Sequence, residues 1–91
     1  MTAIETIEKA ATLARIRLNQ APDYELFVSI VAQLDYLLSV LTGAEKDRSR
    51  VKEIIVGHYA VREFAESDPE FAEVLKVAQF IASQTAKGLK V

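Results

Sequence analysis

The chain has 91 residues, of which 51% are hydrophobic and 26% are charged, with three Gly and two Pro. A chain of this length forms one domain, and we take residues 1–91 as a single helical domain. The composition excludes disordered and collagen-like proteins. With 11 Lys and Arg against 13 Asp and Glu, the net charge of −2 argues against nucleic acid as a partner, because binding phosphates requires excess positive charge.

The absence of cysteine excludes disulfide frameworks, thiol nucleophiles and thiolate metal sites. Residues 1–18 carry Glu5 and Glu8 and lack an unbroken apolar stretch, so they do not resemble a signal peptide or a transit peptide. No window approaches the ~18 to 20 apolar residues that a membrane span requires. We therefore expect a cytoplasmic protein without a membrane partner.

Two helices are expected in the first half of the chain. Thr2 and Glu5 have the spacing of a capping box, which predicts a first helix that ends near residues 19–21. Its expected core face consists of Ile4, Ile7, Ala11, Ala14 and Leu18. Pro22 or Asp23 is expected to open a second helix that stops at Gly43. The second core face consists of Phe27, Ile30, Val31, Leu34, Leu37, Leu38 and Leu41.

The second half of the chain predicts two more helices. A third is expected from about Asp47 or Ser49, with Gly57 marking a close helix contact and a core face of Val51, Ile54, Ile55, His58, Val61 and Ala65. A fourth begins where Asp68 caps with Pro69 at the first position, or where Ser67 caps with Glu70. It buries Phe71, Val74, Leu75, Ala78, Ile81, Ala82 and Thr85. The predicted fold is all-α, a compact bundle of about four antiparallel helices.

Reactive groups are scarce. His58 is the one imidazole, no serine is placed beside it by the sequence, and Ile55 stands where a bundle metal site needs a carboxylate. The three glycines are isolated, so there is no phosphate-binding loop. Carboxylate pairs such as Glu63 and Glu66 usually form a solvated helix face. We therefore expect no enzyme activity, no catalytic residues, no cofactor and no metal.

The charge layout points instead to a protein partner. Asp68 and Glu70 offset the dipole of the fourth helix, whereas Glu63 and Glu66 lie near a helix C-terminus, where negative charge is unfavourable. A basic partner would explain these two acids. The complete acidic lobe is Glu63, Glu66, Asp68, Glu70 and Glu73.

Tyrosines are the other candidates for a partner surface. Tyr36 and Tyr59 lie off the predicted core faces, and tyrosine is enriched among interface anchors. The alternative is that each ring fills a groove of the bundle with its hydroxyl in water.

The chain resembles the small immunity proteins that protect bacteria from a type VI secretion effector, a toxin that hydrolyses NAD(P)⁺. The similarity is spread over nearly the whole chain, and its last three blocks are the most specific. The blocks are Ile4-Glu5 with Ile7, Tyr24-Glu25, Gln33-Leu34 with Tyr36 and Ser39-Val40-Leu41, Asp47-Arg48-Ser49, Ala60-Val61-Arg62-Glu63-Phe64, Ser67-Asp68-Pro69-Glu70, and Gly88-Leu89-Lys90-Val91.

This resemblance implies a helical inhibitor that binds the toxin's catalytic domain in the cytoplasm and occludes the dinucleotide pocket. A pocket for a pyrophosphate presents positive potential, which suits an acidic inhibitor. The partner-binding residues that follow from the matching blocks and the charge layout are Tyr36, Arg62, Glu63, Glu66 and Asp68, with His58 and Tyr59 as further candidates.

Three alternatives stay open at this point. Residues 54–59 depart from the family's pattern, so the target could be an effector with a different toxic activity. The chain could also be a structural or adaptor bundle, as a homodimer built on exposed Tyr and Leu. A helix-turn-helix regulator would need a basic recognition helix, and the third helix offers Arg48, Arg50 and Lys52 before it becomes apolar and acidic.

Overall fold

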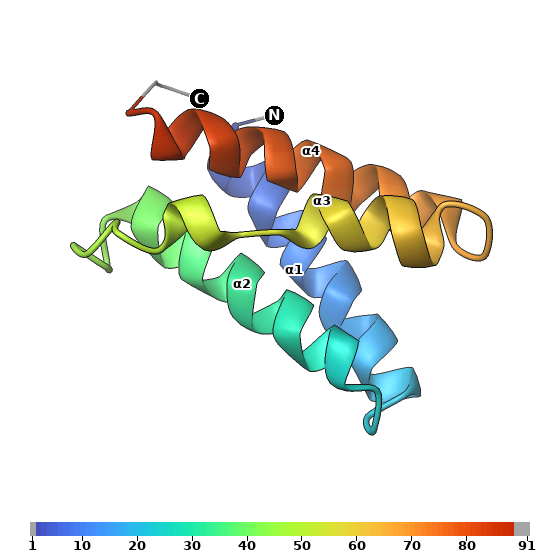
Figure 1. Cartoon of the computed structure of the whole chain (residues 1–91). Helices are drawn as coiled ribbons and strands as arrows, with labels where there is room; N and C mark the ends of the chain where they lie inside the picture. Colours follow the sequence, from blue (N-terminus) through green and yellow to red (C-terminus); the bar gives the residue numbers. More distant parts are fainter. Residues whose placement is uncertain (1, 89–91) are drawn as a thin grey trace.

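The computed structural model describes residues 2–88, which are helical and contain no β-strand (Figure 1). The elements in chain order are α1 (Ala3–Gln20), α2 (Glu25–Thr42), the 3-10 turn η1 (Val51–Glu53), α3 (Val56–Tyr59), the π-helical turn η2 (Ala60–Phe64) and α4 (Pro69–Ala86). The predicted all-α fold is confirmed. Residues 89–91 of the last block of family resemblance lie outside the described residues.

α1 starts with the predicted capping box. The Glu5 backbone N–H donates to Thr2 Oγ1 at 3.1 Å, and the Thr2 backbone N–H donates to Glu5 Oε1 at 3.2 Å. These two bonds satisfy donors that the first helical turn leaves free. The helix ends at Gln20, two residues before Pro22. Its buried residues are Ile7, Ala10, Ala11 and Ala14.

α2 begins later than predicted. Pro22 and Asp23 form a turn closed by the Tyr24 N–H, which donates to the Ala21 carbonyl at 3.1 Å, so the helix cannot begin before Glu25. Its C-terminal end is at the predicted place, because Gly43 has a φ of +84°, a left-handed conformation that glycine adopts without steric cost.

The apolar content of α2 was underestimated. The helix Glu25–Thr42 has 18 residues and a mean hydropathy of 1.5, so by length and composition it could span a membrane. The expectation that no window approaches the apolar length of a membrane span was therefore wrong. Core helices of globular proteins have the same composition. In the fold, α2 packs along α1, and Ile30, Leu34 and Leu37 have no exposed surface.

The third helix is broken, which contradicts the prediction of one continuous helix. Residues 54–55 are not helical and separate η1 from α3, which continues directly into η2. An extended residue turns the side-chain direction by about half a turn, so the helical face that follows is shifted. The buried residues are Val51, Ile54, Val56, Ala60 and Phe64, whereas Ile55, His58, Val61 and Ala65 are exposed and the prediction that they lie in the core was wrong.

α4 starts at the Asp68–Pro69 cap. Asp68 Oδ1 accepts a hydrogen bond from the Phe71 N–H, while the Ser67 hydroxyl donates to the Glu63 carbonyl and takes no part in capping. The predicted core face of α4 is buried except for Val74, which is half-buried, and Ala72 joins it.

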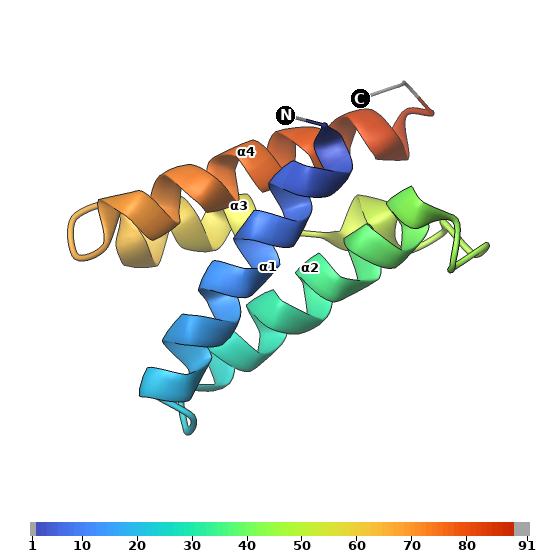
Figure 2. The ribbon, with the colours of Figure 1, turned by 180° about the vertical axis from the view of Figure 1, so that it is seen from behind.

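The helices form two crossed pairs (Figures 1 and 2). α1 and α2 run in opposite directions, as do the α3–η2 segment and α4, and α1 also packs against α4. Three aromatic rings join the pairs: Phe64 lies 5.7 Å from Phe27 and 5.0 Å from Phe71, and Phe27 lies 6.0 Å from Phe71, between ring centroids. The core elements α2, η2 and α4 therefore meet at this cluster of three rings.

Candidate partner interface

A groove of about 430 Å³ lies between α2 and the broken third segment. We call it the α2 groove. Four of its residues come from α2 and five from residues 50–59, which include η1 and α3. The lining consists of Ser29, Ala32, Gln33, Tyr36, Arg50, Glu53, Ile54, Ile55 and Tyr59. Two of the predicted partner-binding residues, Tyr36 and Tyr59, are therefore brought together here.

Tyr36 holds the loop that leads into the groove. Its hydroxyl donates to the Asp47 carbonyl at 2.8 Å and accepts from the Arg50 N–H at 3.3 Å. The ring is half-buried and lies under the Arg50 guanidinium, whose Cζ is 5.6 Å from the ring centroid. The hydroxyl is thus bonded to backbone groups of the loop, whereas the alternative interpretation of the sequence placed it in water.

The loop itself is locally ordered by Asp47. Its carboxylate accepts from the Ser49 N–H at 2.9 Å, and the hydrogen bonds from Ser49 hold the pKa of Asp47 below its usual value. The Asp47 N–H in turn donates to the Glu45 carboxylate at 3.0 Å. These short-range bonds fix the approach of the chain to Arg50.

Two glutamines, which we call the glutamine clamp, hold the break at residues 54–55. Gln33 of α2 accepts from the Ile55 N–H at 2.8 Å. Gln79 of α4 donates to the Ile54 carbonyl at 2.9 Å and accepts from the Gly57 N–H at 3.0 Å. The clamp therefore provides bonds that a continuous helix would have made within itself.

The clamp was missed by the sequence reasoning, and only Gly57 gave a signal for it. A Cβ on Gly57 would lie 2.7 Å from both Cβ and Cγ of Gln79, which confirms the predicted close contact.

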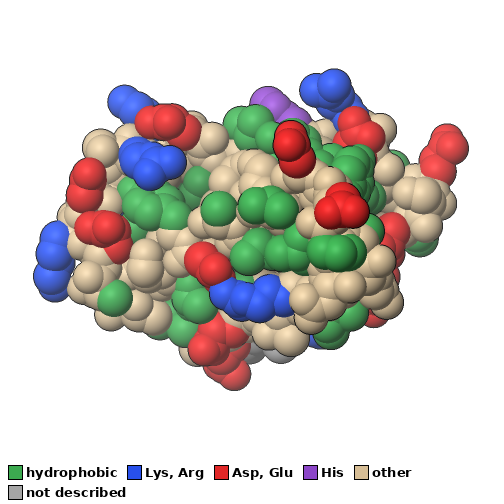
Figure 3. Space-filling view, turned by 90° about the horizontal axis from the view of Figure 1, so that it is seen from below, with side chains coloured by type: hydrophobic (Ala, Val, Ile, Leu, Met, Phe, Trp, Pro, Cys, Tyr) green, Lys and Arg blue, Asp and Glu red, His purple; other side chains and the backbone are tan. Residues whose placement is uncertain are grey.

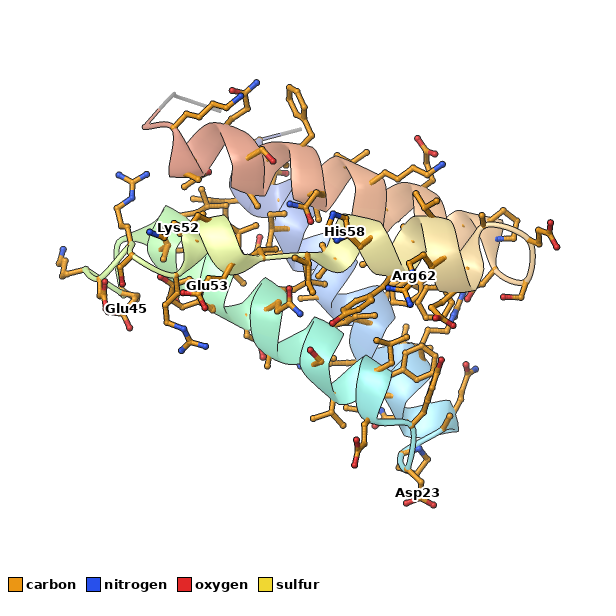
Figure 4. The ribbon with its side chains drawn as sticks, in the orientation of Figure 1. Asp23, Glu45, Lys52, Glu53, His58 and Arg62 are labelled. Carbon is orange, nitrogen blue, oxygen red and sulfur yellow. The ribbon has the colours of Figure 1, made fainter. Side chains whose placement is uncertain are left out.

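The candidates His58 and Arg62 lie elsewhere on the same segment. Both side chains are exposed, and Figure 4 shows them on α3 and η2, away from Lys52 and Glu53 at the other end of the segment. Within residues 2–88 the His58 side chain forms no hydrogen bond, and no group of three or more His, Asp and Glu side chains is placed to hold a metal ion.

Arg62, Glu63 and Glu66 share a second surface, which we call the η2 depression. It measures about 380 Å³ and is lined by Val61, Arg62, Glu63, Ala65, Glu66 and Ser67. All of these residues are exposed. The structure thus places five of the seven predicted partner residues on two separate surfaces, and His58 and Asp68 line neither of them.

Asp68 belongs to neither surface. Its carboxylate accepts from Arg17 Nε of α1 at 2.6 Å, and Arg17 Nη2 lies 3.4 Å from Glu70 Oε1. The Arg17 guanidinium lowers the pKa of Asp68, and the same bond raises the pKa of Arg17. Two of the five acids of the predicted lobe are therefore neutralised within the chain by a base that lies 51 residues from Asp68 in sequence.

The face formed by α1 and α2 combines apolar and charged side chains. Figure 3 views it from below and shows hydrophobic side chains across its middle, with Asp, Glu, Lys and Arg around and between them. The large exposed apolar residues here are Ile16 of α1, Val28 of α2 and Tyr24, which directly precedes α2. Arg15 of α1 and Asp35 of α2 form an ion pair between the two helices.

Comparisons with known proteins agree on one family. The sequence model of the Tsi6 family matches residues 2–84. The chain is 43% identical over 91 residues to the immune protein Tsi6 of Pseudomonas aeruginosa strain PAO1, which covers all of this chain and 97% of that protein.

Solved structures show the same relationship. A chain from the structure of Tse6 in complex with Tsi6 matches with a TM-score of 0.93 at 42% identity, covering 99% of this chain and 96% of that chain. The structure of Tsi6 from Pseudomonas aeruginosa matches with a TM-score of 0.88 at 43% identity, covering 100% of this chain and 95% of that chain. The helical arrangement described above, with its sequence identity over the whole chain, shows that this protein belongs to the Tsi6 family.

Proposed function

We propose that this chain is an immunity protein that binds a toxin similar to Tse6 and neutralises it. The observation that carries this proposal is the match over nearly the whole chain, at 42% identity, to a chain from the structure of Tse6 in complex with Tsi6. At this identity the two chains share their fold, and the binding surface depends on side chains that the fold places similarly.

We further propose that the target is an NAD(P)⁺ glycohydrolase of a type VI secretion system and that the chain occludes its dinucleotide pocket. The family resemblance and the surface charge support this target. The net charge is −2, and Glu63 and Glu66 form no ion pair within residues 2–88. Free acids of this kind are attracted to a pocket with the positive potential that a pyrophosphate requires.

In this proposal the chain acts by binding alone, without catalysis, and it acts in the cytoplasm, where the toxin consumes its substrate. A groove lined by two tyrosines and an arginine suits a protein partner, because Tyr and Arg are enriched among the residues that dominate binding energy.

Growth rescue tests the proposal. The toxin encoded beside the gene for this chain is expressed in bacteria with or without the chain, and both growth and cellular NAD(P)⁺ are measured. We expect the chain to restore both and to form a stoichiometric complex on size exclusion. If the toxin alone stops growth without lowering NAD(P)⁺, and the chain still restores growth, the glycohydrolase target is contradicted. If the chain neither restores growth nor forms a complex, the immunity function is contradicted.

A matched pair of variants separates binding from folding. Glu63→Gln with Glu66→Gln removes the free acids of the η2 depression, and Glu5→Gln with Glu8→Gln removes the same charge at exposed positions of α1. If charge attraction assists binding, the first pair slows association at low salt more than the second. Equal association rates for both pairs would remove the support that the η2 depression gives.

A further inference from the structure

The α2 groove is held in one conformation before any partner binds. Both ends of the Gln33 amide are used, since Nε2 donates to Ser29 Oγ at 3.0 Å while Oε1 accepts from the Ile55 N–H. The Tyr36 hydroxyl is bonded to two backbone groups of the loop. The polar atoms that shape the groove are therefore satisfied internally and need no rearrangement on binding.

Three polar side-chain groups that line the groove have no hydrogen-bond or ion-pair partner within the described residues. Within the described residues 2–88, the Arg50 guanidinium, the Glu53 carboxylate and the Tyr59 hydroxyl form no hydrogen bond or ion pair. Arg50 and Glu53 are three residues apart, and the Glu53 N–H donates to the Arg50 carbonyl at 3.0 Å in the turn that carries both. Opposite charges at this spacing would be expected to pair, yet these two form no ion pair with each other. Arg50 only adds a smaller attraction to Asp47, whose pKa is lowered first by the hydrogen bonds from Ser49.

Arg50 has the most contacts of these three groups that fix its position before binding. Its backbone N–H is bonded to the Tyr36 hydroxyl, and its guanidinium lies over the ring of the same residue. The ring contact covers one side of the guanidinium, while its N–H donors form no hydrogen bond within the described residues. A guanidinium held in this way loses less conformational freedom when it binds a carboxylate with two parallel hydrogen bonds.

The break at residues 54–55 gives the groove its apolar contact. Ile54 is 4% exposed and Val56 is fully buried, whereas Ile55 between them is 37% exposed. In a continuous helix the Ile55 side chain would follow the predicted core face; the glutamine clamp instead holds it at the groove beside Ala32 of α2. The groove thus contains an exposed isoleucine and an arginine without an ion-pair partner, a combination typical of the centre of a protein interface.

We propose that the α2 groove is the toxin-binding centre of this chain and that Arg50 binds a carboxylate on the toxin, next to an apolar contact with Ile55. The proposal rests on the proposed immunity function and assigns to it one surface and one kind of toxin segment. The partner segment carries an Asp or Glu for Arg50 and an apolar side chain for Ile55.

Titration calorimetry with the purified toxin encoded beside the gene for this chain tests the assignment. We expect Arg50→Ala to raise the Kd about tenfold or more, because truncation of a central arginine typically costs more than 1.4 kcal/mol, the equivalent of tenfold. Arg50→Lys keeps the charge but not the fork, so its Kd falls between those of the wild type and Arg50→Ala. Lys52→Ala is the matched control, an exposed base on the same turn, and is expected to change the Kd less than threefold.

The tyrosine and isoleucine have their own variants. Tyr36→Phe removes the two hydrogen bonds to the loop and keeps the ring, and we expect it to weaken binding several-fold, with Tyr24→Phe on exposed ring Tyr24 as a control near the wild type. Ile55→Ser is expected to weaken binding as well. Circular dichroism and the melting temperature of each variant separate a lost contact from a lost fold.

The carboxylate is identified by double-mutant cycles. Each Asp and Glu on the toxin surface is changed to its amide and combined with Arg50→Ala, and one position is expected to show a clear coupling. Failure of every toxin acid to couple would overturn the carboxylate assignment. Wild-type affinity for both Arg50→Ala and Ile55→Ser, with Arg62→Ala or Glu66→Gln weakening binding instead, would move the interface to the η2 depression. A wild-type chain that does not bind the toxin at all would contradict the immunity function itself.

Discussion

The Asp68 carboxylate joins two helices that are far apart in sequence: Oδ2 accepts from Arg17 Nε at 2.6 Å while Oδ1 accepts from the Phe71 N–H at 3.4 Å. One side chain thus caps α4 and binds the end of α1. The guanidinium also lies 5.9 Å from the centroid of the Phe71 ring. The two side chains of the pair are only 20% and 25% exposed, so water screens their attraction less than that of a surface pair.

Asp68→Asn isolates the ion pair from the cap. Asn caps a helix about as well as Asp, so the substitution removes mainly the charge. We expect the free energy of unfolding at pH 7 to fall by about 1.5 to 3 kcal/mol, the range for a hydrogen bond to a charged group. Urea denaturation measures this, and Glu73→Gln, an exposed acid of the same helix, is expected to stay within about 0.5 kcal/mol of the wild type.

The pair also makes stability depend on pH. The pKa of Asp68 in the folded chain lies below the unfolded value of 3.8, so its contribution is complete above about pH 4 to 5 and is lost as the pH falls through the lower folded value. The raised pKa of Arg17 affects stability only in strongly alkaline solution, because the guanidinium stays charged below that range. The difference between the wild type and Asp68→Asn should therefore shrink in acid, and parallel curves of stability against pH would contradict the assignment.

Gly57→Ala tests the close contact between α3 and α4. The new Cβ would lie 2.7 Å from Cβ of Gln79, an atom that moves only with the helix backbone. We expect a loss of about 1 to 3 kcal/mol from overpacking, together with a shift of the Gln79 side-chain amide signals in NMR spectra. Gly43→Ala is the control: it has open space around it and strains only its own left-handed backbone, so those signals stay unchanged. A Gly57→Ala variant as stable as the wild type would contradict the contact.

The helix ends that depend on neighbouring residues could be predicted from the sequence. The capping box of Thr2 and Glu5, the left-handed Gly43 and the Asp68–Pro69 start of α4 all depend on groups within a few residues of one another. Local hydrogen bonds of this kind leave a pattern in the sequence. The exact start of α2 could not be predicted from such a pattern, because the turn at Pro22 competes with helix initiation there.

The break in the third segment could not be predicted in this way. Residues 51–58 have helical periodicity, and the bonds that replace the helix come from Gln33 and Gln79, about 22 to 25 positions away. For the same reason the pairing of Arg17 with Asp68 was missed. Two residues predicted from the sequence to bind a partner, Tyr36 and Tyr59, line the α2 groove. Arg50 became a candidate only through the loop that places it over Tyr36.

Phe71 should contribute more to stability than any exposed aromatic residue. It has no exposed surface and contacts the rings of Phe27 and Phe64, so Phe71→Ala removes a buried side chain from the point where α2, η2 and α4 meet. We expect a loss of about 3 to 5 kcal/mol, a large part of the stability of a small domain. Phe80→Ala, at a ring that is 61% exposed, should change the unfolding free energy by less than about 1 kcal/mol. Similar losses in the two variants would contradict the described core.

The two halves of the glutamine clamp should differ in their effects. Gln79→Met leaves the Ile54 carbonyl and the Gly57 N–H without a partner at a partly buried site, so we expect a loss of about 1 to 3 kcal/mol. Gln33→Met frees the Ile55 N–H of an exposed residue and the Ser29 hydroxyl, which can rotate to another partner, and water can replace the Ile55 bond at a lower cost.

Hydrogen exchange measured by NMR distinguishes the two variants residue by residue. The Gly57 amide should exchange faster in Gln79→Met and unchanged in Gln33→Met, while the Ile55 amide should exchange faster in Gln33→Met. Global unfolding alone would speed up all protected amides by a similar factor, so a selective effect separates local release from lower stability. Uniform acceleration in both variants would mean that the break at residues 54–55 is held by packing of Ile54 and Val56 and not by the clamp.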